Sequence, residues 1–288
     1  MSRLNEIVVI SGKGGTGKTT LTASIIPYLG NCVIADCDVD APDLDILFEK
    51  KLISHKEFSG SNKAYINNET CIKCNKCIEN CKFNAISDNY IINEMRCEGC
   101  TVCEYICPVD AISMYKAKTG ELYISETVYG EIVHAKLNPG EETSGRLISE
   151  VRKKSKEIAK NNSINNIIID GAPGVACNVI SSITGVTKVI IVTEPTMSGI
   201  HDLKRVYELT SKFRLEVEVV INKYDLSIEK STEIEKYCME NKIKLELKIA
   251  FNENIVKAIT KKQIPSIYLK NWFMELGFDK WCDSLVNK

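Results

Sequence analysis

The glycine-rich segment near the amino terminus limits the possible folds of this chain more than any other feature. A short apolar run at residues 7–10 leads into Gly-Lys-Gly-Gly-Thr-Gly-Lys-Thr-Thr at residues 12–20. This segment satisfies the Walker A pattern, in which glycines at a strand-to-helix turn let backbone N–H groups surround phosphate oxygens. The pattern predicts a strand, a phosphate-binding loop and a helix, in that order. A glycine-rich turn without a ligand is the alternative.

Two residues of this loop carry chemistry in a Walker A motif. We expect Lys18 to neutralise the β and γ phosphates of a nucleotide and the Thr19 hydroxyl to coordinate Mg²⁺. The predicted nucleotide-binding residues of the loop are Gly12, Lys13, Gly14, Gly15, Thr16, Gly17, Lys18, Thr19 and Thr20.

Five more apolar runs indicate further strands of the same sheet. They lie at residues 32–35, 167–169, 189–192, 217–221 and 245–249. Short continuous apolar runs separated by helix-length segments are typical of parallel strands that are buried on both faces. We therefore predict an α/β fold with a mostly parallel sheet of at least six strands and helices on both faces. Residues 122–133 are expected to be strand broken at Gly130, and residues 144–160 a charged helix.

Two acidic loops follow these apolar runs, at the strand ends where open α/β sheets bind ligands. Asp38 lies in Asp-Cys-Asp-Val-Asp at residues 36–40, and Asp170 opens Asp-Gly-Ala-Pro-Gly at residues 170–174. We expect Asp170 to contact Mg²⁺ through water, and Asp38 to contact the metal or to orient and deprotonate the attacking water. Turn formation or helix capping is the alternative role for such aspartates.

A third strand end carries Asn-Lys-Tyr-Asp at residues 222–225, which matches the base-reading motif of small GTPases. We expect Asn222, Lys223 and Asp225 to contact the nucleotide base. Polar residues that merely end a strand are the alternative.

Eight of the thirteen cysteines form a duplicated pattern. Cys-x2-Cys-x2-Cys-x3-Cys occurs at residues 71–81 and again, 26 residues later, at residues 97–107. In bacterial ferredoxins with this spacing, the fourth cysteine of each run binds the other 4Fe-4S cluster. The predicted ligands are Cys71, Cys74, Cys77 and Cys107 for cluster 1, and Cys97, Cys100, Cys103 and Cys81 for cluster 2.

Zinc and disulfide bonds are the alternatives for these eight cysteines. Zinc ribbons use paired cysteines with longer gaps. Disulfide bonds need an oxidising compartment, whereas the amino terminus lacks a signal-peptide pattern and we expect a cytoplasmic protein. Only the second run ends in Cys-Pro. Proline at this position mainly fixes the backbone turn, so its absence after Cys81 bears on the local geometry more than on ligation. The other five cysteines, at positions 32, 37, 177, 238 and 282, lack ligand spacing and are expected to be buried and free.

Turn-rich segments at residues 59–62 and 118–120 bracket the cysteine-rich region. We predict that a small ferredoxin-like α+β domain, residues 63–118, is inserted into a nucleotide-binding domain formed by residues 1–62 and 119–288. The formal net charge of −1 gives no reason to expect nucleic-acid binding. The amphipathic stretch at residues 272–286 has no basic face, so we expect a helix packed on the core and no membrane contact.

The loop sequences also resemble a known family. Lys-Gly-Gly-Thr-Gly-Lys-Thr together with Asp-Cys-Asp and Asp-Gly-Ala-Pro-Gly is similar to the deviant Walker A ATPases MinD, ParA, Mrp and the nitrogenase iron protein. The resemblance implies ATP more than GTP as the nucleotide, a homodimer or a heterodimer with a paralogue, and a catalytic Lys13 that reaches the phosphates of the partner. It also places Cys177 where the nitrogenase iron protein holds a bridging cluster, although no second matching cysteine is found.

Three functions fit these motifs. The first is an ATPase that couples a nucleotide-driven change of the dimer to electron transfer through two 4Fe-4S clusters, toward a protein redox partner. The second is an Mrp-like carrier that donates iron-sulfur clusters. The third is a MinD-like positioning switch whose clusters sense redox state.

Overall fold

The computed structural model describes residues 4–141 and 144–286. Within these residues, nine strands form one sheet in the order β11-β10-β9-β1-β8-β2-β7-β6-β3. The strands from β11 to β7 are parallel, whereas β6 and β3 are antiparallel at one edge. The bounds are β1 (Asn5–Ser11), β2 (Val33–Asp36), β3 (Lys51–Phe58), β6 (Gly120–Thr127), β7 (Gly130–Leu137), β8 (Asn166–Pro173), β9 (Lys188–Thr193), β10 (Glu216–Asn222) and β11 (Lys244–Ile249).

The predicted fold class is confirmed. Each of the six apolar runs coincides with a parallel strand, although β2 begins at Val33, one residue after the start of its run. The central strands are buried along almost their whole length. The expected strand material at residues 122–133 is two strands, because β6 ends at Thr127 and β7 begins at Gly130, which closes the hairpin with φ 129°. The edge strand β3 is an addition that the apolar runs did not indicate.

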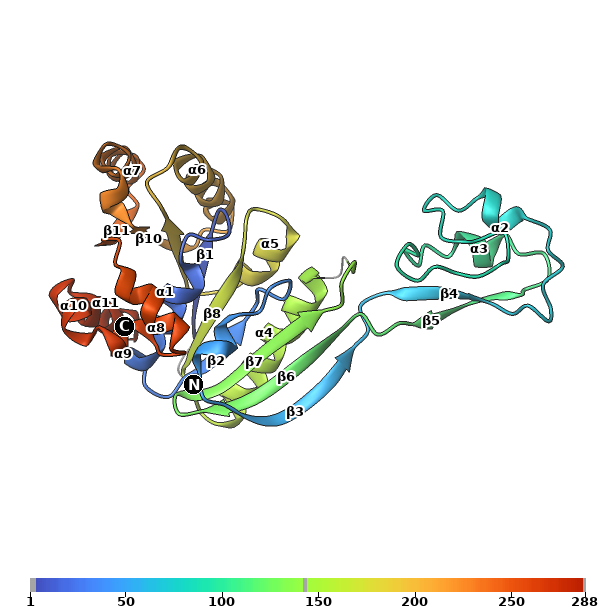
Figure 1. Ribbon diagram of the computed structural model, residues 1–288, viewed down its shortest axis with the longest axis horizontal. Helices are drawn as coiled ribbons and strands as arrows, with labels where there is room; N and C mark the ends of the chain where they lie inside the picture. Colours follow the sequence, from blue (N-terminus) through green and yellow to red (C-terminus); the bar gives the residue numbers. More distant parts are fainter. Residues whose placement is uncertain (1–3, 142–143, 287–288) are drawn as a thin grey trace.

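Helices cover both faces of the sheet (Figure 1). One face packs Val8 and Val33 against α4, α5, α6 and α7, and the other packs Ile7 and Ile34 against α1, α10 and α11. Neighbouring strand residues serve opposite faces because their side chains alternate. The bounds are α1 (Lys18–Ile25), α4 (Ser144–Asn161), α5 (Cys177–Ile183), α6 (Met197–Lys212), α7 (Ile228–Glu240), α8 (Glu253–Thr260), α9 (Pro265–Tyr268), α10 (Lys270–Glu275) and α11 (Phe278–Val286), with short 3-10 turns η1 (Ile26–Tyr28), η2 (Leu44–Leu47) and η3 (Tyr224–Leu226).

The last helix packs on the core, as predicted from its pattern. Phe278, Trp281 and Leu285 on α11 are buried, and the ring of Phe278 meets that of Phe273 edge-on at a centroid distance of 4.8 Å. No helix in the described ranges is both long enough and apolar enough to cross a membrane.

The cysteine-rich segment, residues 62–116, stands away from the main sheet and is called the arm below (Figure 1). Two antiparallel strands, β4 (Asn62–Ile66) and β5 (Ile112–Lys116), lead into and out of it, and two one-turn helices, α2 (Lys76–Glu79) and α3 (Val102–Tyr105), lie between them. The arm has a small core of its own, which includes Ala64, Ile66, Ala85, Ile86 and Ile112.

The two segments that join the arm to the sheet are held by hydrogen bonds. Thr119 N–H donates to Phe58 O at 2.8 Å, and Gly60 N–H donates to the Thr119 hydroxyl at 2.8 Å. Asn138 N–H, just after β7, donates to Thr119 O at 2.9 Å, and the Arg146 guanidinium donates to Gly60 O. The base of the arm is therefore tied to β7 and to the start of α4.

A row of aromatic rings crosses the antiparallel edge of the sheet. His55 on β3, Tyr123 on β6 and His134 on β7 pair in register and stack at centroid distances of 5.0 and 5.1 Å. His134 is buried, its Nε2 lies 3.5 Å from Asp45 Oδ2, and its Nδ1 has no hydrogen-bond partner among the described residues. Burial, together with the charge of Lys50, lowers the pKa of His134 to about 4.

This histidine predicts a loss of stability in acid. Between about pH 6.5 and about pH 4, His134 binds a proton in the unfolded chain but not in the folded one. The free energy of unfolding therefore decreases by roughly 3 kcal/mol as the pH is lowered through this range. Thermal unfolding at pH 7 and pH 4.5 measures the effect. We expect His134→Phe to lose less Tm on acidification than the wild type, and His201→Phe, at an exposed histidine, to behave like the wild type. Equal losses in all three proteins would contradict the assignment.

Candidate functional site

The loop between β1 and α1 has the conformation that a Walker A motif requires. Gly15 and Gly17 have positive φ values of 81° and 91°, which a residue with a Cβ rarely adopts. A Cβ at Gly17 would also lie 2.3 Å from Asn222 Nδ2, and this amide donates to Thr16 O at 2.8 Å. The Thr16 hydroxyl is buried and has no hydrogen-bond partner within the described chain. The loop therefore leaves a polar group for a ligand to satisfy.

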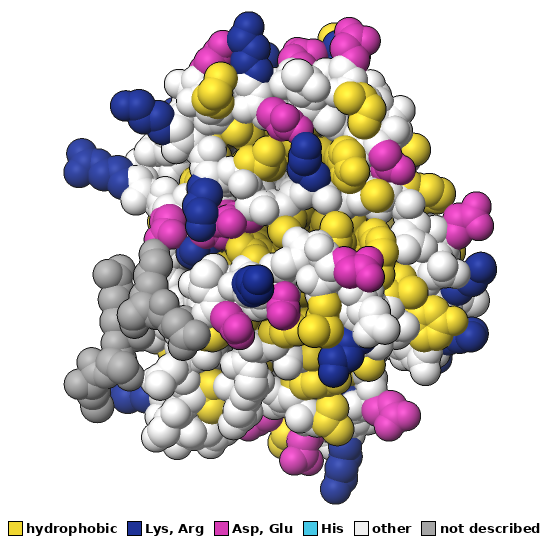
Figure 2. Space-filling model, turned by 90° about the vertical axis from the view of Figure 1, so that its left-hand side faces the viewer, with side chains coloured by type: hydrophobic (Ala, Val, Ile, Leu, Met, Phe, Trp, Pro, Cys, Tyr) yellow, Lys and Arg dark blue, Asp and Glu magenta, His cyan; other side chains and the backbone are white. Residues whose placement is uncertain are grey.

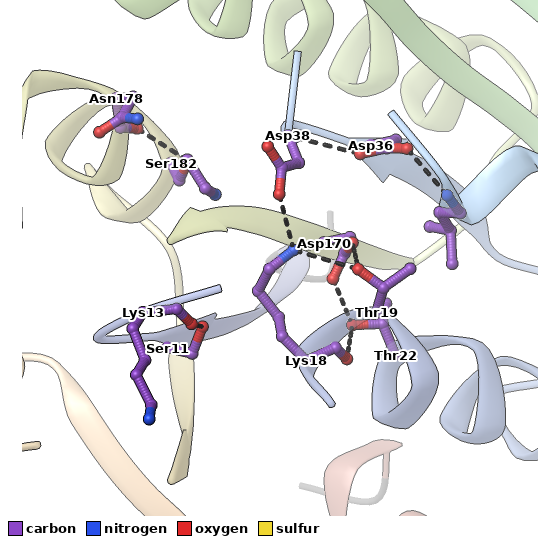
Figure 3. Close-up of polar contacts among 12 residues, drawn as sticks. Ser11, Lys13, Lys18, Thr19, Thr22, Asp36, Asp38, Asp170, Asn178 and Ser182 are labelled. Carbon is purple, nitrogen blue, oxygen red and sulfur yellow. Dashed lines mark hydrogen bonds and ion pairs between the residues drawn. The ribbon is translucent and has the colours of Figure 1, made fainter. Parts of the chain in front are cut away.

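Lys18 lies among carboxylates at the start of α1 (Figure 3). Its Nζ is 2.9 Å from Asp170 Oδ2 and 3.5 Å from Asp38 Oδ2, and its side chain is 6% exposed. Burial alone would lower the pKa of Lys18, but the charges of Asp170, Asp38 and Asp36 outweigh it and raise the pKa. A buried cation at this strand edge is what an incoming phosphate would contact.

Two threonines of α1 hold the Asp170 carboxylate. Thr19 donates to Asp170 Oδ2 at 2.7 Å, and Thr22 donates to Asp170 Oδ1 at 2.7 Å. The structure thus brings Asp170 next to Lys18 and Thr19, which precede it by 152 and 151 positions in the sequence. Thr22 was missed, although its position one helical turn after Thr19 was a usable signal.

Asp36 is a second residue to which the sequence motifs assigned no role. It lies opposite Asp170 in the β2–β8 register and is fully buried. Its carboxyl accepts hydrogen bonds from the N–H groups of Asp38 and Leu44, at 3.1 and 3.2 Å. Burial, and then the nearby Asp170 charge, raise its pKa well above the usual range. Asp36 fixes the start of the loop that carries Asp38, whose own pKa is raised mainly by burial.

Lys13 points away from this group (Figure 3). Its Nζ lies 2.5 Å from Glu194 Oε1 and 3.0 Å from Ser198 Oγ, and Lys223 Nζ lies 3.5 Å from the other oxygen of Glu194. Burial acts to raise the pKa of Glu194, but hydrogen bonding to Lys13 and the charges of both lysines lower it overall. Within this chain, Lys13 is thus paired with Glu194, a partner that its sequence position did not reveal.

A pocket of about 170 Å³ opens beside the phosphate loop. Figure 2 views the molecule from the side of α7, α8 and α10 and shows hydrophobic side chains gathered across the middle of this face. One wall is apolar and comes from α8 and the segment before it, and the other carries the loop glycines. The lining residues are Gly15, Gly17, Thr20, Leu21, Ser24, Val192, Val220, Asn222, Lys223, Ile249, Ala250, Phe251, Asn252, Ile255, Val256, Ile259 and Phe273.

Two of the three predicted base-contacting residues line this pocket. Asn222 and Lys223 do so, whereas Asp225 lies outside the lining and accepts a hydrogen bond from Phe251 N–H at 2.6 Å. The sequence analysis did not indicate the apolar contribution of α8. The spacing of Ile255, Val256 and Ile259 is that of any amphipathic helix and does not point to a ligand.

In the arm, the backbone repeats with the same 26-residue offset as the cysteines. The helices α2 and α3 are related by this offset, and so are three pairs of residues with positive φ. The pairs are Lys73 and Gly99, Asn75 and Thr101, and Asn84 and Asp110. The duplicated sequence therefore folds as a duplicated structure, although only the second copy has proline after its fourth cysteine.

The four cysteines predicted to bind cluster 2 line one small cavity. They are Cys97, Cys100 and Cys103 of the second run and Cys81 of the first. Three of the ligands predicted for cluster 1 lie in or against the small core of the arm, where Cys77 is buried and Cys71 and Cys107 are partly buried. The fourth, Cys74, is exposed. The structure thus brings the last cysteine of one run to the first three of the other.

Backbone N–H groups point at three of these sulfur atoms. Ala64 N–H donates to Cys97 Sγ at 3.5 Å, Ala85 N–H to Cys81 Sγ at 3.3 Å, and Ala111 N–H to Cys107 Sγ at 3.3 Å. Such bonds stabilise thiolates, which are the form that binds iron.

In the described part of the chain, no three His, Cys, Asp or Glu side chains are grouped closely enough to hold a single metal ion. The ligands of a 4Fe-4S cluster need not lie so close together, because each thiolate binds a separate iron atom. The donor type, the cavity and the N–H···S bonds fit such a cluster.

The five remaining cysteines divide into two groups. Burial was the expectation for all, and Cys32, Cys37, Cys238 and Cys282 are buried, with thiol pKa values raised by burial. The expectation is wrong for Cys177, which is exposed at the first position of α5 because that short helix begins at the surface.

The family model for the CobQ/CobB/MinD/ParA nucleotide-binding domain, CbiA, matches residues 7–265. The chain belongs to this family. Solved structures with a similar fold include MinD from Pyrococcus horikoshii complexed with Mg-ADP. It superimposes on this chain with a TM-score of 0.61, over 98% of this chain and 95% of that one, at 18% sequence identity. The resemblance to MinD and ParA stated from the loop sequences is therefore confirmed.

Curated relatives of this CobQ/CobB/MinD/ParA family member include two proteins of Methanocaldococcus jannaschii. Uncharacterized protein MJ0578 is 37% identical over 227 residues, 76% of this chain and 78% of the relative. Uncharacterized protein MJ0579 is 29% identical over 289 residues, 96% of this chain and 98% of the relative. A shorter match, 36% identical over 56 residues, is to subunit PorD of pyruvate synthase from Methanothermobacter marburgensis, and it covers 19% of this chain and 69% of that subunit.

Proposed function

We propose that this chain is a Mg²⁺-dependent ATPase that couples nucleotide hydrolysis to electron transfer through two 4Fe-4S clusters. One observation carries the proposal: four cysteines of ferredoxin spacing, drawn from both runs, line one cavity in an arm whose base is hydrogen-bonded to the nucleotide-binding sheet. We assign the clusters to a ferredoxin-like domain of residues 63–118, inserted between residues 1–62 and 119–288. A protein that only bound nucleotide would not need this arrangement.

The nucleotide chemistry follows from the residues around Lys18. Its ammonium would leave the carboxylates and contact the β and γ phosphates, while Thr19, and Asp170 through water, would hold Mg²⁺. Asp38 would accept a proton from water as that water attacks the γ phosphorus. The bond from this phosphorus to the bridging oxygen then breaks, which yields ADP and inorganic phosphate. Burial raises the pKa of Asp38, which makes its carboxylate a stronger base than that of an exposed aspartate.

The pocket beside the loop supports ATP over GTP. Its apolar wall suits the face of a purine, and Asn222 supplies an amide at its rim. In GTPases with Asn-Lys-x-Asp, the aspartate binds the base, but here the Asp225 carboxylate is occupied by Phe251 N–H. A guanine bound by both oxygens of this carboxylate would have to share Oδ1 with that N–H group.

The cysteine sets support permanent clusters. When bound, each cluster would accept or release one electron, and the protein would fix its position and surroundings. We assign Cys71, Cys74, Cys77 and Cys107 to cluster 1 and Cys97, Cys100, Cys103 and Cys81 to cluster 2. The short match to a pyruvate synthase subunit supports a partnership with a redox protein that donates or accepts single electrons.

We also propose that the active form is a dimer of this chain, or of this chain with a paralogue. In the single chain, Lys13 is paired with Glu194 and takes no part in the Lys18 group. Release from Glu194 would free Lys13 to reach the phosphates of a partner, as the resemblance to deviant Walker A ATPases implies.

The steady-state ATPase rate of anaerobically prepared protein tests the coupling. We expect hydrolysis of ATP at a higher rate than GTP, and a rate that changes when dithionite reduces the clusters, because linked equilibria act in both directions. ATP hydrolysis that is identical in oxidised and reduced protein would contradict coupling. Transfer of iron to an apo-ferredoxin during turnover would favour the carrier function instead.

A further inference from the structure

We infer that the salt bridge between Lys63 and Glu141 links the nucleotide site to cluster 2. Through this link, nucleotide binding would change the midpoint potential of cluster 2. This inference rests on the proposed function and goes beyond it, because it assigns the coupling to two residues outside both predicted sites. The link begins at the loop that carries Asp38 and ends at a ligand of cluster 2.

Lys63 is the arm's buried cation. It lies on β4 and is only 4% exposed, although lysine is rarely buried without a partner. Its Nζ donates to the backbone carbonyl of Cys97 at 2.9 Å, while the next residue, Ala64, donates its N–H to Cys97 Sγ at 3.5 Å. A Cβ at Gly99 would lie 2.2 Å from Asn62 O, so the start of β4 and the second cysteine loop are in close contact. The charge of Lys63 is thus fixed beside a predicted ligand of cluster 2.

Glu141 neutralises this lysine from outside the arm. Its Oε1 lies 3.2 Å from Lys63 Nζ, and its side chain is 14% exposed. Glu141 follows β7 in a tight turn, since its N–H donates to Asn138 O at 3.2 Å. The salt bridge therefore joins the arm to the loop after β7.

The same loop is in contact with the nucleotide site. Leu137 N–H, at the end of β7, donates to Val39 O at 3.1 Å, and Val39 directly follows Asp38. The neighbouring residue Cys37 donates its N–H to Asp170 O at 2.8 Å. A displacement of the Asp38 loop on nucleotide binding would therefore pull on the segment that ends in Glu141, through one hydrogen bond and four residues of chain.

The charge pair has a definite effect on the cluster. Reduction adds one electron, so a positive charge beside the cluster favours the reduced form, and a carboxylate paired with that charge weakens the effect. Lys63 is buried and the Glu141 side chain is 14% exposed, so solvent screens the pair less than it would a pair on the surface. Moving Glu141 away from Lys63 should raise the midpoint potential of cluster 2. The midpoint potential of cluster 1 should stay nearly unchanged, because its predicted ligand Cys71 follows the other end of β4 from Lys63.

Redox titration with dithionite as the one-electron donor, followed by EPR, tests this inference. We expect the midpoint of one cluster to fall in Lys63→Met and to rise in Glu141→Gln, while the other cluster keeps its wild-type value. The shift that MgATP causes in the wild type should be lost in both variants. Lys63→Arg retains the charge and should retain the wild-type midpoint, and Lys116→Met removes an exposed lysine of β5 as the matched control.

The outcomes separate this inference from the proposed function. Wild-type protein without iron, or without ATPase activity, would overturn the proposed function, and the inference with it. Wild-type protein with two clusters and ATPase activity, but with midpoints that none of the variants moves, would overturn the inference alone. Iron content per chain and thermal unfolding of each variant show that a shifted midpoint does not come from a damaged arm.

Discussion

Replacing Lys18 by methionine is expected to lower the rate of ATP hydrolysis at least about 100-fold, because the transferred phosphate loses its buried cation. Lys18→Arg should fail as well, since a planar guanidinium does not fit a site shaped for an ammonium at 2.9 Å from Asp170. Steady-state phosphate release at saturating MgATP measures both rates.

Folding and catalysis must be separated in this experiment. Without Lys18, the carboxylates of Asp36, Asp38 and Asp170 have lost their common cation, so Lys18→Met should also unfold at a lower temperature. Lys18→Arg keeps the positive charge and should unfold closer to the wild type. Lys236→Met, at an exposed lysine of α7, is the control and should hydrolyse ATP normally. Wild-type hydrolysis by either Lys18 variant would contradict the assignment of the phosphate site.

Pairs of cysteine substitutions should distinguish crossed from uncrossed ligation. If ligation is crossed, Cys77→Ser with Cys107→Ser removes two ligands of one cluster, so about half of the iron should remain. Cys77→Ser with Cys81→Ser then removes one ligand from each cluster, and both should be lost or damaged. Iron per chain and the EPR spectrum of the reduced protein measure the difference.

Uncrossed ligation predicts the opposite result for the two pairs, so the experiment has a clear negative outcome. Cys177→Ser is the matched control, because Cys177 is exposed and belongs to neither run. It should retain the full iron content. A loss of iron in Cys177→Ser would instead favour a cluster bound at α5.

The sequence predicted the elements whose signals are local. Parallel strands such as β8 and β9 are buried on both faces, so each appears as a continuous apolar run. The edge strand β3 is exposed along nearly its whole length and carries charged residues, so it has no such signal. The last helix was predicted correctly because Phe278, Trp281 and Leu285 form one apolar stripe.

In the candidate sites, too, only the features with a local sequence signal could be predicted. Lys18 and Thr19 are neighbours in a motif, and their placement followed from it. The contacts of Lys13 with Glu194, and of Lys63 with Glu141, join residues that are far apart in the sequence and have no motif in common. Asp36 looked like one more acidic residue at a strand end, and only its burial and its bonds to two N–H groups give it a role.

The central claim is that one chain holds both a nucleotide site and two cubane clusters. Iron and acid-labile sulfide per chain, determined on protein purified without oxygen, test it most directly. We predict about eight iron and about eight sulfide per chain, together with an EPR signal after reduction. Colourless protein with no sulfide, and with at most zinc bound to its cysteines after anaerobic reconstitution, would contradict it.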